Sequence, residues 1–169
     1  MILTHDVIIA EIEAGNIRIT PYDEKMVGPA SVDLHLGDEL RIPDGGREVI
    51  DVSDGTDIKG FSTLCRLDGG YELAAGATAL GITREHIALA PDICGRLEGR
   101  SRFARLGLMV HVTAGFVSPG VENRQVLEIS NLSTRTLRLH AGSSICQIIF
   151  ERAEGSAVYG GRFADQEEL

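Results

Sequence analysis

The amino-acid sequence predicts a mainly β protein, a distorted β-barrel or jelly roll, and two observations favour this fold class. The 20 glycines and 5 prolines punctuate short apolar runs in place of long helical periods, as in strands joined by turns. Strand-like runs also recur at short spacing, without the helices that alternate with strands in a doubly wound sheet. The length of 169 residues suits one domain with its own core, residues 1–169.

One amphipathic helix is predicted near the start of the chain. Thr4 is placed to cap it, Ile8 and Ile12 fall on one face, and Gly15 is placed to end it. Alternation of apolar and polar residues between turn residues predicts strands, at residues 17–19, 48–52, 71–73, 77–83, 87–89, 93–97, 108–112, 126–131, 136–139 and 144–150. Residues 43–59 are rich in glycine and aspartate, so we expect a surface hairpin or loop there.

Residues 29–37 also alternate between apolar and polar side chains. This alternation places Asp33 and His35 on the same polar face. Two ligands of unlike type are too few for a metal site. We therefore interpret Asp33 and His35 as a structural polar pair.

Charge and cysteine content limit the classes of function. A net charge of -9 at pH 7 argues against a nucleic-acid binder, because such domains usually carry a basic surface. The cysteines, Cys65, Cys94 and Cys146, are widely spaced in apolar strand-like contexts, as expected for reduced core thiols of a cytosolic protein. The first six residues have no basic region and no sustained apolar run, so we expect neither a signal peptide nor a membrane span.

A cluster of arginines follows one of the predicted strands. Residues 99–108 contain a glycine, then Arg100, Arg102 and Arg105 with the hydroxyl of Ser101, and then an apolar turn typical of a short helix. Guanidinium groups and backbone N–H groups at a helix start suit a phosphate. The alternative is an exposed basic turn that binds nothing.

Glu128 is the carboxylate that best suits acid–base chemistry. In its strand, Val126 and Glu128 point to one face while Leu127 and Ile129 point to the other. Partial burial would raise the pKa of Glu128, which suits a group that takes up a proton and later returns it. The alternative is an edge-strand glutamate that faces water.

Two other hydrolase chemistries lack their motifs in this chain. The sequence contains no Gly-x-x-x-x-Gly-Lys-Ser/Thr phosphate-binding loop. It also contains neither the His-x-Glu nor the Pro-Cys-x-x-Cys with which zinc-dependent base deaminases hold their metal. Hydrolytic chemistry would therefore depend on carboxylates, arginines and backbone donors.

Taken in order, these segments resemble the deoxycytidine triphosphate (dCTP) deaminases of the trimeric dUTPase-like superfamily. The matching segments cover nearly the whole chain, at residues 1–4 with the first helix, 29–37, 99–108, 111–116, 127–131 and 159–166. The resemblance implies a distorted β-barrel or jelly-roll protomer and a homotrimer with active sites between subunits. It also implies a magnesium ion on the triphosphate and no zinc, and it leaves open whether dTTP is a feedback inhibitor.

The resemblance assigns roles residue by residue. Glu128 corresponds to the general acid/base that activates water for attack at C4 of cytosine, and Ser101 and Arg105 correspond to catalytic residues near the reacting base. The positions that correspond to substrate-binding residues are Arg100, Arg102, Phe103, Ala104, Ala114, Ser118, Val126, Leu127, Gln147, Tyr159, Arg162 and Gln166.

The end of the chain is glycine-rich and matches a segment that closes over the ligand in the family. We expect residues 155–169 to form a flexible tail over the active site, the alternative being a frayed end. A glycine-rich tail has little means of folding tightly over its own barrel. This favours sites that subunits share.

Four positions depart from the family pattern. Arg102 replaces a serine, Arg162 a lysine and Asn123 a glycine. Ser118 stands where deaminases and dUTPases generally have an aspartate. A serine hydroxyl is a poor base at neutral pH, so cleavage of the triphosphate should suffer more than deamination.

The resemblance implies a cytoplasmic enzyme that hydrolyses dCTP to dUTP and ammonia and supplies the dUTP and dUMP route to thymidylate. One alternative is a bifunctional enzyme that continues to dUMP and pyrophosphate. The other is a trimeric nucleotide-binding or regulatory protein that has lost catalysis, which the departures at 102 and 118 allow. Retention of Glu128, Ser101 and Arg105 argues against this last alternative.

Overall fold

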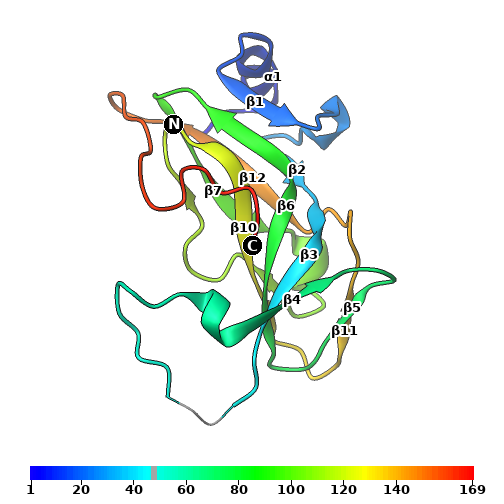
Figure 1. The fold of residues 1–169 in the computed structure, drawn as a ribbon. Coiled ribbons are helices and arrows are strands. Elements are labelled where there is room, and N and C mark those ends of the chain that lie inside the picture. Colours follow the sequence, from blue (N-terminus) through cyan, green and yellow to red (C-terminus); the bar gives the residue numbers. More distant parts are fainter. Residues whose placement is uncertain (47–48) are drawn as a thin grey trace.

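Short β-strands dominate the structure (Figure 1). The structure is a computed structural model that describes residues 1–46 and 49–169. Its strands are β1 (Ile17–Thr20), β2 (Val32–Leu34), β3 (Leu36–Pro43), β4 (Ser62–Arg66), β5 (Tyr71–Leu73), β6 (Thr78–Leu89), β7 (Ile93–Gly99), β8 (Leu108–Val110), β9 (Phe116–Val117), β10 (Glu122–Asn131), β11 (Leu137–Leu139) and β12 (Cys146–Arg152). Its helical segments are α1 (His5–Glu13), α2 (Ser101–Ala104) and the 3-10 turns η1 (Glu24–Met26) and η2 (Ile58–Phe61). The predicted mainly β fold class is confirmed.

Two antiparallel sheets enclose the apolar core. The larger sheet has the order β4-β3-β6-β10-β8, with β1 also paired to β6, and the smaller sheet has the order β2-β12-β7-β9. Fully buried side chains come from both sheets, such as Leu40 and Ile129 from the larger and Leu34 and Phe150 from the smaller. Interdigitation of two inner faces is what forms the core of a sandwich or jelly roll.

The predicted N-terminal helix is present as α1. Thr4 is its N-cap residue, although the Thr4 hydroxyl donates to the Asp6 carboxylate (2.9 Å) and not to a backbone group. Ile8 is fully buried and Ile12 packs against the core, as the helical spacing predicts. Gly15 follows the helix with a φ of 76°, a conformation that favours glycine.

β6 unites two strands that the sequence predicts separately, at residues 77–83 and 87–89. Between them, Glu85 is buried and continues the strand. Its carboxylate accepts a hydrogen bond from the backbone N–H of His35 (2.9 Å) and contacts Nδ1 of the His35 ring (2.7 Å). The predicted break was wrong, because a tertiary partner makes a buried carboxylate tolerable inside the strand.

The alternation predicted in residues 29–37 is confirmed, since the apolar side chains at 32, 34 and 36 are all fully buried. Asp33 and His35, however, have different partners. The Asp33 carboxylate lies 2.8 Å from the Arg100 guanidinium, whereas His35 contacts Glu85. Both side chains have a structural polar role, but as members of two ion pairs.

The strand predicted at 48–52 was wrong for residues 49–52, which have no strand structure, and residue 48 lies outside the described residues. The sequence pattern also missed β4 and the part of β3 beyond residue 37. β4 lies at the edge of the larger sheet and exposes most of its side chains. Its sequence therefore carries little of the burial signal by which strands are predicted.

The C-terminal segment folds back onto the larger sheet, where its red trace lies beside β10 (Figure 1). The backbone N–H of Arg124 donates to the carbonyl oxygen of Gln166 (3.0 Å), and the Gln166 side chain donates to the carbonyl oxygen of Arg124 (3.1 Å). The Asn123 amide donates to the carbonyl oxygen of Phe163 (2.7 Å), and Leu169 is buried. The tail thus docks on its own protomer, which corrects the expectation that it has little means of doing so.

Cysteine burial only partly follows the sequence prediction. Cys146 is buried, and burial raises the pKa of its thiol, whereas Cys65 and Cys94 are half-buried. All three are free thiols. Within residues 1–46 and 49–169, the helices are too short or too polar to cross a membrane.

Candidate active site

A cavity of about 770 Å³ opens between the larger sheet, the loops around β9 and the C-terminal tail. Strands β3, β6 and β10 contribute to its walls, as do the tail and the segment that begins η2. The lining residues are Arg41, Asp57, Ile58, Lys59, Leu80, Leu97, His111, Ala114, Phe116, Val117, Ser118, Val121, Asn123, Gln125, Val126, Glu128, Tyr159, Arg162, Phe163, Asp165, Gln166, Glu167, Glu168 and Leu169. The cavity is therefore built from segments that are far apart in the sequence.

Glu128 lies on the wall of this cavity, within β10. β10 is an interior strand between β6 and β8, and Glu128 pairs with Leu80 of β6. The Glu128 side chain is 27% exposed, while Leu127 and Ile129 on the other face are fully buried. The predicted alternation of this strand is confirmed, and the pairing with β8 begins at Ile129, next to Glu128. The Glu128 side chain is half-buried and does not face water as a fully exposed edge residue would.

The loop that follows β8 holds the Glu128 carboxylate. The backbone N–H groups of Thr113 and Ala114 donate to Oε2 of Glu128, at 2.6 and 3.4 Å. The Thr113 hydroxyl donates to the same carboxylate at 3.1–3.2 Å. Hydrogen bonds of this kind favour the charged form of a carboxylate and fix its position.

These contacts decide the ionisation state of Glu128. Burial raises the pKa of the carboxyl group, but the hydrogen bonds from Thr113 and Ala114 and the nearby His111 ring together lower it by more. The pKa of Glu128 therefore lies below its ordinary value, and the rise predicted from burial alone was wrong. At neutral pH the group is an ionised carboxylate.

His111 contacts both the backbone and the side chain of Glu128. Its ring Nδ1 accepts a hydrogen bond from the Glu128 backbone N–H (3.3 Å), which assigns the proton of the neutral ring to Nε2. Nε2 lies 3.2 Å from Oε2 of Glu128, in a direction that forms no hydrogen bond. Burial lowers the pKa of His111 more than Glu128 raises it. A neutral imidazole therefore lies beside the carboxylate at pH 7.

The cavity brings together seven of the fifteen residues that the sequence analysis assigns to the site. These residues are Ala114, Ser118, Val126, Glu128, Tyr159, Arg162 and Gln166. Leu127 has its side chain in the core on the other face of β10. The loop after β8, strand β10 and the tail thus meet at one cavity.

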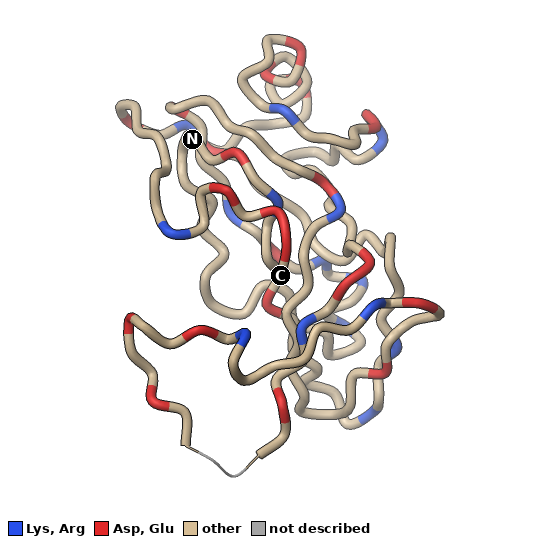
Figure 2. Tube along the Cα trace, in the orientation of Figure 1, with Lys and Arg blue, Asp and Glu red and all other residues tan. Residues whose placement is uncertain are grey.

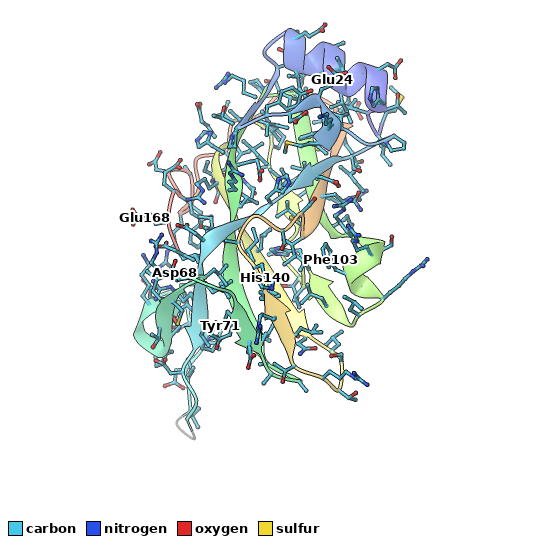
Figure 3. The ribbon with its side chains drawn as sticks, turned by 90° about the vertical axis from the view of Figure 1, so that its right-hand side faces the viewer. Glu24, Asp68, Tyr71, Phe103, His140 and Glu168 are labelled. Carbon is cyan, nitrogen blue, oxygen red and sulfur yellow. The ribbon has the colours of Figure 1, made fainter. Side chains whose placement is uncertain are left out.

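The segment of residues 99–108, which we call the arginine turn, is not part of this cavity. The residues that lie outside it are Arg100, Ser101, Arg102, Phe103, Ala104, Arg105 and Gln147. In Figure 3, the α2 residue Phe103 and the tail residue Glu168 lie on opposite sides of the molecule. Within one protomer, the structure does not bring Ser101 and Arg105 to Glu128.

Arg100 lies instead beside a second cavity, of about 470 Å³. Its guanidinium contacts the Asp33 carboxylate at 2.8 Å and donates to the hydroxyl (2.6 Å) and carbonyl oxygen (3.1 Å) of Ser144. The Gln147 amide donates to the carbonyl oxygen of Gly99 (3.1 Å), directly before the turn. These contacts orient the turn, while Ser101, Arg102 and Arg105 of the turn are exposed.

Charged side chains of both signs line the first cavity, and the tail contributes most of the acidic ones. Figure 2 shows several acidic positions along the end of the chain. The cationic residues are Arg41, Lys59 and Arg162, and the acidic residues are Asp57, Glu128, Asp165, Glu167 and Glu168. An anionic ligand would therefore be attracted to Arg41, Lys59 and Arg162, and the acidic side chains of the cavity, most of them at the end of the tail, would repel it.

Sequence reasoning did not assign Arg41, His111 or Thr113. The last two belong to segment 111–116, which matches the family, but residue spacing alone does not show which of its atoms reach Glu128. Arg41 carries no motif, and only the pairing of β3 with β6 places it opposite Leu80.

The described part of the chain contains no cluster of three His, Cys, Asp or Glu side chains arranged as metal ligands. These residues therefore do not fit a resident metal centre. A magnesium ion that arrives with a triphosphate would be held chiefly by phosphate oxygens and water.

A family model and a curated relative both relate this chain to dCTP deaminases. Residues 2–153 match the family model for dCTP deaminase-like proteins. A curated relative from Parafrankia sp. (strain EAN1pec), named dCTP deaminase, dUMP-forming, is 37% identical over 175 residues, which cover 98% of this chain and 87% of the relative.

Solved structures show the same fold. The crystal structure of 2'-deoxycytidine 5'-triphosphate deaminase from Agrobacterium tumefaciens matches with a TM-score of 0.71 at 24% identity, over 90% of this chain and 48% of that chain. This chain thus spans about half the length of that protein. The dUTPase from Streptococcus mutans matches with a TM-score of 0.50 at 16% identity, over 86% of this chain and 99% of that chain.

Proposed function

This chain belongs to the dCTP deaminase-like family and is an enzyme of that family, and from this premise we propose that it deaminates dCTP with Glu128 as the proton carrier. The observation that carries the proposal is an ionised glutamate, fixed by loop hydrogen bonds, on the wall of a cavity large enough for a nucleotide.

Hydrolytic deamination needs a group that takes a proton from water and passes it to the leaving amino group. Ionised Glu128 accepts the proton as the water oxygen attacks C4 of cytosine. Thr113 and Ala114 favour the carboxylate form, so the protonated glutamate readily gives its proton to the amino nitrogen. The C4–N bond then breaks and ammonia leaves, and the second proton of the attacking water passes from the C4 hydroxyl to N3, which gives the uracil base of dUTP.

We also propose that the site is shared between the subunits of a homotrimer. Glu128 and the arginine turn do not meet within one protomer. In a closed ring, the turn of each subunit, with Ser101 and Arg105, would complete the cavity of its neighbour. Phosphate binding by Arg100 and attack at the base would then combine residues of two subunits.

An apolar surface next to α2 supports this assembly. Leu106, Met109 and Leu132 are 58%, 39% and 67% exposed. They belong to adjacent segments, since the backbone N–H of Leu132 donates to the carbonyl oxygen of Gly107 and Met109 pairs with Ser130. Apolar side chains that gather on a surface are typical of an interface.

A second candidate function differs only in its end product. The relative from Parafrankia is named dUMP-forming, which favours further cleavage of dUTP to dUMP and pyrophosphate. The residue at 118 favours dUTP, because a serine hydroxyl on the cavity wall is a poor base for activating water. The two candidates share the deamination step.

The first experiment is to incubate the protein with dCTP and magnesium and to resolve ammonia, dUTP, dUMP and pyrophosphate over time. Ammonia with equal dUTP supports the first candidate, and ammonia with equal dUMP supports the second. A protein that binds dCTP and releases no ammonia would show that catalysis has been lost. Addition of dTTP tests the feedback inhibition that the resemblance leaves open.

Glu128→Gln should lower kcat by a factor of about 10² to 10⁴, the contribution of a positioned acid–base group, while dCTP still binds. The matched control is Glu122→Gln, on the same strand. Glu122 is exposed and pairs with Arg18 at 3.1 Å, away from the cavity. A Glu128→Gln variant that keeps most of its activity would remove Glu128 from the mechanism.

A further inference from the structure

Arg41 is a buried arginine that pairs with no side-chain carboxylate among the described residues. Its residue exposure is 8%. Nη1 donates to the carbonyl and hydroxyl oxygens of Ser62 at the long distances of 3.5 and 3.4 Å, and Nε has no hydrogen-bond partner. A buried charge is usually paired with an opposite charge, and no side-chain carboxylate of the described residues supplies one to the Arg41 guanidinium.

Arg41 and Glu128 belong to one row across three neighbouring strands. Arg41 of β3 pairs with Leu80 of β6, and Leu80 pairs with Glu128 of β10. Side chains at paired positions project from the same face of a sheet, and all three residues line the same cavity. Two strand spacings separate Arg41 from Glu128, roughly 10 Å between their backbones. A ligand that reaches both has a reactive group at one edge and an anionic group at the other.

One oxygen atom already marks the position of the missing anion. Nη2 of Arg41 donates to the main-chain oxygen of Leu169 at 3.0 Å. Glu167 and Glu168 line the same cavity and would repel an anion. An anionic ligand at Arg41 would therefore take the place of Leu169, and this part of the tail would move aside.

We propose that Arg41 forms an anion subsite that binds a phosphate oxygen of the nucleotide whose base faces Glu128. This proposal rests on the proposed function and names a further binding residue in the same cavity. The planar guanidinium presents a fork of N–H donors that suits phosphate oxygens. The charge of Arg41, which no described side-chain carboxylate pairs with, would be neutralised on binding.

The test is calorimetric titration of Arg41→Gln with dCTP, with deoxycytidine and with inorganic triphosphate, each with excess magnesium. We expect dCTP and inorganic triphosphate to bind about 10- to 100-fold more weakly, the effect of losing a charge-assisted hydrogen bond, while deoxycytidine changes little. Arg41→Lys keeps the positive charge but not the forked N–H donors of the guanidinium. Its affinity for dCTP and for inorganic triphosphate should therefore lie between the affinities of the wild type and of Arg41→Gln. It also serves as the readout if Arg41→Gln does not fold in thermal melts.

Arg124→Gln is the matched control for tail docking. Nη1 of Arg124 donates to the carbonyl oxygen of Glu167 (3.2 Å), but Arg124 does not line the cavity. If Arg41 only anchors the tail, Arg41→Gln and Arg124→Gln will lower the affinity for dCTP by the same factor, and the proposal is overturned. Wild-type affinity of Arg41→Gln for both dCTP and inorganic triphosphate would overturn it as well.

The outcome separates this proposal from the proposed function. A wild-type protein that releases no ammonia from dCTP, yet binds inorganic triphosphate through Arg41, would refute deamination and leave the anion subsite standing. A protein that deaminates dCTP and binds it equally well with Arg41→Gln would refute only the subsite.

Discussion

The ionisation state of Glu128 depends on a few groups in one loop. Thr113 and Ala114 donate hydrogen bonds to its carboxylate, and the neutral ring of His111 contacts both its backbone and its side chain. At the scale of the residue, the polar contacts lower the pKa of Glu128 by more than burial raises it. Glu128 is therefore a carboxylate before any substrate binds.

His111 should make the folded protein less stable as the pH falls. Burial lowers its pKa below the ordinary value of 6.5, so below pH 6.5 the unfolded chain takes up a proton that the folded protein does not. Stability should decrease from pH 6.5 down to the pKa of the folded state. Glu128, whose pKa is also lowered, should add a second loss below pH 4.5.

Thermal melts of the wild type and of His111→Asn between pH 7.5 and 5 should check this prediction about His111. Asn can still accept from the Glu128 backbone N–H but does not titrate, so the melting temperature should fall less steeply with pH. His5→Gln, at an exposed position of α1, should keep the wild-type slope. Equal slopes for His111→Asn and wild type would contradict the assignment.

Ser118 determines, at the same scale, where the reaction stops if the first candidate product is right. Ser118→Asp would add a carboxylate to the cavity wall, a better base than the serine hydroxyl. We expect this variant to raise the rate of dUTP cleavage and to change deamination much less. Chromatography of the nucleotides formed from dUTP measures the effect. Stoichiometric dUMP from the unmodified protein would show that another group activates the water.

At the scale of the element, the turn around α2 is positioned by contacts from other strands. Asp33 of β2 and Ser144 hold the Arg100 guanidinium, and the Gln147 side chain of β12 donates to the backbone of Gly99. α2 itself is one helical turn with exposed polar side chains. The smaller sheet, rather than any helical propensity, therefore decides where this turn lies.

Arg100→Ala should lower the affinity for dCTP by about 10- to 100-fold, because a charge-assisted contact with phosphate is lost. The affinity for deoxycytidine, which has no phosphate, should fall much less. Titration with both ligands measures the difference. Asp33→Asn is the control, since it breaks the same ion pair but keeps the guanidinium, and it should weaken dCTP less. Equal losses of dCTP and deoxycytidine in Arg100→Ala would argue against a phosphate role.

At the scale of the whole molecule, the protomer presents two separate sets of site residues. One set lines the cavity of Glu128, and the other lies on the arginine turn on the opposite side in Figure 3. Exposed apolar side chains lie next to the turn, on the surface that we propose a second copy covers. A ring of subunits is the simplest assembly that unites the two sets.

Glu128→Gln and Arg100→Ala protomers, each impaired alone, should recover activity when they are unfolded and refolded together. Random assembly gives about one site in four that combines an intact Glu128 with an intact Arg100 of the neighbour. Each variant refolded alone is the control. Light scattering should give three times the mass of the protomer, and a fully active monomer would contradict the shared site.

Local patterns in the sequence were sufficient for the fold class, for α1 and for the two faces of β10. These features depend on neighbouring residues, whose spacing shows which side chains are buried. The strand pattern also singled out Glu128, and the resemblance to the family added its role and the residues of the loop and tail that line its cavity. The extent of β6 and the presence of β4 were beyond such patterns, because Glu85 is buried by a tertiary partner and β4 is exposed at an edge.

Only the tertiary structure decided the protonation state of Glu128 and which other residues share its cavity. Thr113 and Ala114 lower the pKa of a carboxyl group 14 or 15 positions away in the sequence. Arg41 faces the same cavity as Glu128 through two strand pairings. The tail docks on the larger sheet, although its glycine content gave it little expected means of folding tightly over its own barrel. Such contacts join groups that are distant in the chain, and their energies depend on distance and burial, which residue order alone does not specify.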